Sequence, residues 1–133
     1  MRTVLVLVGL GQIALAVASL FLPRILGWRS QTARLEPLTR RVFWVYAAYI
    51  LGTNLCLGSL TALAPDLLLD RSVLARMVAG YAAVYWAARL VIQFVWFRGV
   101  CPKGRWYAAA DAAVTAAFAF WAASYGAILF DLW

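Results

Sequence analysis

Four long apolar segments dominate the chain and limit what it can fold into. They cover residues 3–22, 42–64, 72–97 and 106–130. Each is close to the ~20 residues that an α-helix needs to cross the hydrocarbon of a bilayer. The connections between them are not Ser/Gly-rich enough to be domain linkers. The sequence therefore predicts an all-α, polytopic membrane protein: one antiparallel bundle of four transmembrane helices, with residues 1–133 as a single domain.

Composition supports a lipid environment. The 133 residues are 66% hydrophobic, whereas soluble domains are about half apolar. A globule of this length buries only roughly two-thirds of its surface, so the apolar excess must face lipid. The first segment has an alternative interpretation as a signal peptide, because Arg2 and the Ala16–Ala18 triplet imitate its charged start and cleavage site. Its apolar run continues to Leu22, however, and we expect a retained helix.

Charged residues are distributed unevenly over the connections. The first and third connections are basic, whereas the second contains Asp66 and Asp70, with Arg71 and Arg76 nearby. Because positive residues stay in the cytoplasm, we expect a multi-pass protein of a bacterial inner membrane with both termini outside the cytoplasm. The basic residues are Arg24, Arg29, Arg34, Arg40 and Arg41 in the first connection and Arg98, Lys103 and Arg105 in the third.

The net charge of +7 does not indicate nucleic-acid binding. The basic residues lie beside apolar runs, where they set topology, and form no stripe interleaved with polar residues. In the segment 24–41, arginines alternate with apolar residues such as Ile25, Trp28 and Leu35. This segment either lies along anionic lipid headgroups or is an ordinary basic loop that only fixes orientation.

The residues needed for catalysis and for cofactor or metal binding are scarce. Histidine is absent, which removes the usual general base and the commonest metal and haem ligand. Cys56 and Cys101 are expected at different depths, too far apart for a disulfide, and no CxxC motif is present. No glycine-rich phosphate loop occurs. We therefore predict a protein that is not an enzyme, with no catalytic, cofactor-binding or metal site.

Two charges, Arg89 and Asp111, fall inside the expected spans, where charge is costly and often functional. Their helices are consecutive and antiparallel, so the two side chains are expected to form an ion pair in the cytoplasmic half. Gln93 follows Arg89 by four residues and shares its helix face. Three interpretations remain open: a structural tie between helices, a site for an anionic headgroup or substrate on Arg89, and a proton-coupled role for Asp111.

Four further residues complete the candidate substrate- or lipid-binding set. Tyr85 and Trp86 are too deep for an interfacial aromatic belt, so we expect them to pack against another helix or a bound hydrophobic molecule. Asn54 and Gln12 lie deeper, on the second and first helices. The length and four-helix plan resemble the small multidrug-resistance transporters, which depend on a glutamate in the first helix. Gln12 cannot exchange a proton, so the resemblance does not imply their activity.

Small residues form possible packing faces. Ala75, Ala79, Ala83 and Ala87 recur every four residues in the third segment, on a face expected to lie well apart from Arg89. The sequence favours a non-enzymatic accessory or structural subunit of a larger membrane assembly. The alternative is a small oligomeric carrier or lipid-binding protein with Arg89 as anion contact. The expected partners are anionic lipids and other membrane subunits or further copies. The fourth segment is denser in alanine, and a second possible packing face there includes positions 109, 112, 113, 116, 119 and 123.

Overall fold

The computed structural model describes residues 1–100 and 102–133. Cys101, for which no disulfide was expected, lies outside the described residues. The described chain is all-α and contains no strand. Its helices are α1 (Arg2–Ser19), α2 (Leu22–Ile25), α3 (Trp28–Thr32), α4 (Pro37–Leu63), α5 (Pro65–Leu68), α6 (Val73–Val95) and α7 (Arg105–Leu129).

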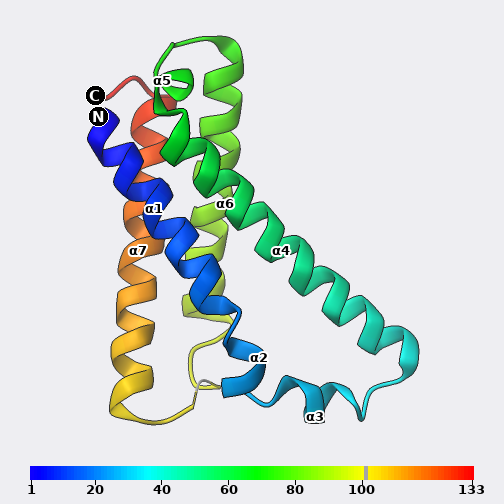
Figure 1. The fold of residues 1–133 in the computed structure, drawn as a ribbon. Coiled ribbons are helices and arrows are strands. Elements are labelled where there is room, and N and C mark those ends of the chain that lie inside the picture. The colour runs from blue at the N-terminus through cyan, green and yellow to red at the C-terminus, as the bar shows by residue number, and fades with distance from the viewer. Residues whose placement is uncertain (101) are drawn as a thin grey trace. The chain divides into compact units, whose positions relative to one another are not determined.

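Within the described residues, four helical stretches are long and apolar enough to cross a membrane, which confirms the predicted fold class (Figure 1). They are Arg2–Ile25, Pro37–Leu63, Val73–Val95 and Arg105–Leu129. The second starts five residues earlier than the sequence suggested. Its proline fits the first helical turn, where a missing N–H costs nothing. The long basic connection therefore shrinks, and α2 and α3 occupy part of it.

The chain divides into two compact units, each described by itself. The first, here called the hairpin unit, contains residues 1–5 and 65–133. Trp86 of α6 stacks on Phe118 of α7 with ring centroids 5.3 Å apart, and Arg76 pairs with Asp131 beyond the end of α7. The earlier α6 residue, Arg76, thus meets the later residue, Asp131, whereas the later α6 residue, Trp86, meets the earlier α7 residue, Phe118. The two helices are therefore antiparallel neighbours (Figure 1).

A seam of buried residues holds α6 against α7. On α6 the buried positions alternate in steps of four and three, as in coiled coils. Most of them are alanines, which let the backbone approach closely, whereas α7 mainly supplies large side chains. The buried residues are Ala75, Ala79, Ala82 and Trp86 on α6, and Phe118, Trp121, Ser124, Tyr125 and Ile128 on α7.

The α6–α7 contact follows the four-residue alanine repeat of α6 only over its first two members. Ala75 and Ala79 are buried, but Ala87 is exposed, and Ala82 continues the seam instead. A repeat of four residues drifts by about 40° per step around a helix with 3.6 residues per turn, so it leaves the contact face. The buried alanines consequently share a face with Arg89 and do not lie apart from it.

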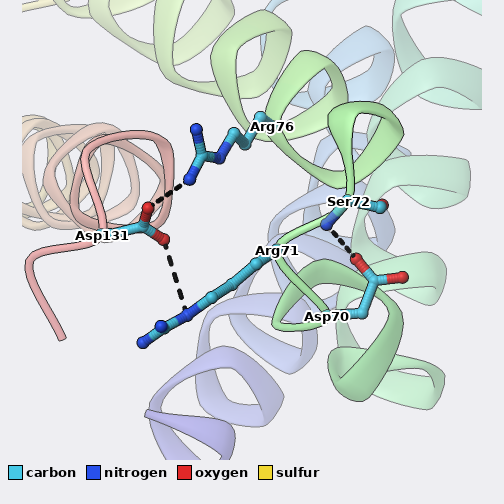
Figure 2. Close-up of polar contacts among 5 residues, drawn as sticks. All are labelled: Asp70, Arg71, Ser72, Arg76 and Asp131. Carbon is cyan, nitrogen blue, oxygen red and sulfur yellow. Dashed lines mark hydrogen bonds and ion pairs between the residues drawn. The ribbon is translucent and has the colours of Figure 1, made fainter.

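An ion-pair clasp joins the start of α6 to the segment after α7 (Figure 2). Arg76 Nη2 lies 2.5 Å from Asp131 Oδ2, and Arg71 Nε lies 3.9 Å from Asp131 Oδ1. The Arg71 guanidinium also lies 5.3 Å from the centre of the Trp133 ring. We call Arg71, Arg76 and Asp131 the Asp131 clasp. It closes the α6–α7 hairpin at the end opposite to the loop between the helices.

The turn before α6 is fixed by local hydrogen bonds. The Ser72 hydroxyl accepts from the Ala75 N–H at 3.0 Å, a helix N-cap. The Asp70 carboxylate accepts from the Ser72 N–H at 2.8 Å (Figure 2). Hydrogen bonding from the side chain and the backbone of Ser72 lowers the pKa of Asp70 from its ordinary value of 3.8.

The second unit contains residues 6–64, and α1 meets α4 in it at glycines. A Cβ placed on Gly9 would lie 2.4 Å from the backbone N of Ala62 and 2.6 Å from the carbonyl O of Gly58. A Cβ on Gly58 would lie 3.0 Å from the Cβ of Gln12. The two helix backbones are therefore in direct contact, an arrangement that small residues permit.

The segment before α4 folds back on that helix. Gly27 precedes α3 with a φ of 64°, a left-handed conformation that glycine adopts readily. The turn positions Trp28 edge-on to Phe43 and Trp44 of α4, with centroids 5.1 and 6.1 Å apart. Aromatic contacts thus anchor the basic segment to the start of α4.

Candidate polar site between α6 and α7

Gln93 bridges the two charges inside the α6 and α7 spans. Arg89 Nη1 donates to Gln93 Oε1 at 3.2 Å, and Gln93 Nε2 donates to Asp111 Oδ1. Arg89 and Gln93 continue the buried seam of α6 in its steps of three and four, and Asp111 lies seven residues before Phe118 of the α7 seam. The helix packing itself therefore brings the three polar side chains together.

The direct Arg89–Asp111 ion pair expected from the sequence is replaced by this bridge. Within the described chain, the ion pairs closer than 4.0 Å do not include these two residues. Gln93 has both an acceptor and a donor on one amide, so it can serve a cation and an anion at the same time. The charges are held near one another but one amide apart.

Two aromatic rings surround the Arg89 guanidinium. Its Cζ lies 5.0 Å from the Phe118 ring centre and 5.1 Å from the Phe97 ring centre, distances typical of cation–π contacts. Phe97 lies beyond the end of α6. The Arg89 side chain therefore runs along α6 toward that end, as long cationic side chains do when they reach for a membrane interface.

Neither charge of the site is fully satisfied by groups of residues 1–100 and 102–133. Arg89 is half-buried and donates one hydrogen bond to a described residue, Gln93, out of the five N–H donors of a guanidinium. Asp111 is exposed and accepts one hydrogen bond, also from Gln93, from the described part of the chain. The site can therefore still accept and donate hydrogen bonds through charged groups.

Trp86 packs as the sequence predicts. Its ring is 1% exposed and contacts Phe118 and Trp121 of α7, the latter with centroids 4.6 Å apart. Its buried Nε1 has no hydrogen-bond partner among residues 1–100 and 102–133. Tyr85 is half-buried and lies edge-on to Trp86, with centroids 5.0 Å apart. Trp86 therefore belongs to the α6–α7 contact. Tyr85 flanks it on α6, and its expected contact with another helix or a bound molecule stays a prediction.

Gln12 and Asn54 belong to the unit of residues 6–64 and are described with it. Gln12 is fully buried, and its Cβ lies at the close contact of α1 with α4 near Gly58. Asn54 is half-buried on α4. Their predicted place beside Arg89 stays a prediction.

The sequence reasoning missed Phe97 and Phe118 as neighbours of the arginine. A signal for Phe118 was present, because it follows Asp111 by seven residues and so shares its helix face. Phe97 lies outside the helix, and no periodicity points to it. No group of three or more His, Cys, Asp or Glu residues in the described part could hold a metal ion.

The arginines of segment 24–41 differ from those at the ends of the hairpin unit. Arg2 pairs with Asp66 at 3.1 Å, and Asp131 engages the two arginines of its clasp. By contrast, none of the five arginines between residues 24 and 41 forms an ion pair with a described residue. Their charge is available to groups outside the chain.

Comparison with models of protein families, with curated proteins and with solved structures finds no match for this chain.

Proposed function

We propose that this protein is a non-enzymatic accessory or structural subunit of a larger membrane assembly. The observation that carries the proposal is a face of α7 that is rich in small residues and exposed along its length. We call this face the alanine face; it consists of Ala109, Ala112, Ala113, Ala116, Ala119 and Ala123, all of them exposed.

The alanine face points away from the seam that packs on α6. At 3.6 residues per turn its members occupy about one-third of the helix circumference, on the side away from Trp121 and Ile128. Small faces let a neighbouring helix approach closely, and packing then drives association in lipid. A helix of another subunit is therefore a suitable cover for this face.

The distribution of polar groups supports a role without catalysis. The chain has no histidine, and within the α6 and α7 spans Arg89 and Asp111 are engaged by Gln93. An acid and a base placed around a common substrate position would be the minimum for proton-transfer catalysis. A guanidinium remains charged in proteins and supplies no base.

The charge pattern supports a proposed orientation. We propose a bacterial inner membrane protein with segment 24–41 and the α6–α7 loop in the cytoplasm, and with both termini outside. The five arginines between residues 24 and 41 make no ion pair in the described chain. Clusters of four to eight basic residues beside a span favour anionic lipid headgroups, which we propose as their partners.

Purification from native membranes tests the subunit role. The tagged protein, extracted in mild detergent, is expected to retain a second protein at fixed stoichiometry. Ala116→Leu, on the alanine face, should release that protein because a larger side chain blocks close approach. Ala87→Leu, at an exposed position of α6, is the matched control, and this variant should retain the second protein. A protein that elutes alone or as a homodimer under all extraction conditions would contradict the proposal.

Arg89 supports a second candidate function, a small oligomeric carrier or lipid-binding protein. The observation that favours it is the half-buried guanidinium with one hydrogen bond and no carboxylate in ion-pair contact within the described chain. The unused N–H donors of a guanidinium inside a span favour hydrogen bonds to an anionic acceptor. A homodimer that retains lipid would fit this candidate.

A further inference from the structure

We propose that Arg89 and Asp111 bind the phosphoethanolamine headgroup of a membrane lipid, with its phosphate on Arg89 and its primary ammonium on Asp111. This inference is independent of the accessory role. It deepens the lipid-binding candidate by assigning the ligand class and by giving Asp111 a part in recognition.

The first step is the separation of the two charges. Gln93 occupies the position between them, accepting from Arg89 and donating to Asp111. Because the bridge keeps the guanidinium and the carboxylate from pairing directly, each keeps hydrogen-bonding capacity for another group. Arg89 offers N–H donors, and Asp111 offers a second carboxylate oxygen.

The second step is the chemistry of a group that satisfies both. A charge in a span is costly unless it is paired. An anion alone would complement Arg89 but leave Asp111 next to a like charge. A cation alone would do the reverse. A ligand with an anionic acceptor and a cationic N–H donor on neighbouring atoms complements both residues.

Arg89 and Asp111 lie at the same depth, near one end of the α6–α7 hairpin. Arg89 lies six residues before the end of α6 at Val95, and Asp111 six residues after the start of α7 at Arg105. Both are therefore about 9 Å from the same end of the hairpin. With 23 and 25 residues, both helices exceed the ~30 Å hydrocarbon thickness, so their ends reach the headgroup zone.

The course of the arginine side chain agrees with that depth. The guanidinium lies over Phe97, beyond the end of α6, so the charged atoms are closer to the interface than the Arg89 backbone is. Asp111 is exposed on α7, so a headgroup can approach it. A phospholipid places a phosphate and an amine at this boundary while its acyl chains stay in the hydrocarbon.

Native mass spectrometry of the delipidated, detergent-solubilised protein tests the proposal. Four lipids with identical acyl chains are titrated: phosphatidylethanolamine, its monomethyl and dimethyl derivatives, and phosphatidylcholine. The wild-type affinity is expected to fall along the series, with phosphatidylcholine about tenfold weaker, because a quaternary ammonium cannot donate a hydrogen bond to Asp111. Equal affinity across the series would overturn the proposal, and this test needs no variant.

Two substitutions separate the roles. Asp111→Asn preserves an acceptor for Gln93 but removes the charge, so it should abolish the preference for phosphatidylethanolamine over phosphatidylcholine. Arg89→Gln should weaken all four lipids about tenfold, since all carry the phosphate. Arg76→Gln and Asp131→Asn in the clasp are the matched controls and should leave the series unchanged. A preference that survives Asp111→Asn would refute the assignment of the ammonium.

Two more probes test whether the ligand is a lipid or a soluble headgroup, and whether it must carry a positive as well as a negative charge. Soluble phosphoethanolamine, at the concentration at which the lipid saturates the protein, should not displace the lipid, because it lacks the acyl chains that add apolar contact with the helices. Phosphatidylglycerol should bind more weakly than phosphatidylethanolamine. Effective displacement would overturn the assignment to a lipid. Tighter binding of phosphatidylglycerol would reduce the site to an anion contact on Arg89 and refute the paired recognition.

Discussion

Replacing Gly9 by alanine should lower the free energy of unfolding of the unit of residues 6–64, because the α1–α4 contact leaves no room for a Cβ at this position. The new Cβ would lie 2.4 Å from the Ala62 N, 2.6 Å from the Gly58 O and 2.8 Å from the Ala62 Cα. All three are backbone atoms, so no side chain can rotate away. The helices must separate or shift.

The magnitude follows from two opposing contributions. Overpacking a tight contact costs about 1–3 kcal/mol, and a contact with rigid backbone belongs at the upper end. Alanine in place of glycine returns up to about 1 kcal/mol of helix propensity. We therefore expect Gly9→Ala to lower the free energy of unfolding by about 2 kcal/mol.

Gly52→Ala is the matched control. It lies in α4 of the same unit, and its new Cβ would meet nothing within 4 Å. It should be neutral or stabilise the protein by up to about 1 kcal/mol. Both variants would be unfolded by SDS in mixed micelles and followed by circular dichroism. If they shift the midpoint equally in sign and size, the close α1–α4 contact is refuted.

Three further predictions concern the polar ends of the protein. Asp131→Asn keeps a side chain suited to the left-handed backbone but removes the clasp charge. It should lower the thermal midpoint by an amount worth about 1 kcal/mol at low salt and by less at high salt. An effect independent of salt would contradict an ionic clasp. Because the folded pKa of Asp70 is lowered, its stabilising contribution is present above the ordinary value of 3.8 and is lost as the pH falls through the lowered value; Asp70→Asn should flatten the acid limb of a thermal-stability profile, and an unchanged limb would contradict this. In a background without native cysteines, a reagent confined to the outside should label Leu67→Cys and not Ser30→Cys; the reverse pattern would invert the proposed topology.

The helices were predictable because their signal is redundant. Any of the four segments contains enough apolar residues to identify a span, and an error of a few residues at an end changes nothing in the conclusion. The start of α4 at Pro37 was missed for another reason. Its first turns contain Thr39, Arg40 and Arg41, so their low hydropathy predicted a loop, although a helix can extend into the headgroup region.

The candidate site was predictable in its members and not in its connections. Antiparallel neighbours with charges at similar depths must bring Arg89 near Asp111, and a four-residue step places Gln93 on the same face. Which groups share hydrogen bonds depends on side-chain lengths and on the register of α6 against α7, set by packing such as that of Trp86 on Phe118. The hydrophobic periodicity of the sequence does not determine the register of α6 against α7 to the nearest residue.

The contact between Trp86 and Trp121 also gives the molecule an internal optical reporter. The two indole rings have centroids 4.6 Å apart and planes inclined at 65°. At this separation their electronic transitions couple, and rigid asymmetric surroundings give aromatic side chains a near-ultraviolet circular dichroism signal that disappears when tertiary packing loosens. The dichroism of the unlabelled protein in vesicles would therefore distinguish a docked α6–α7 hairpin from two inserted but separated helices.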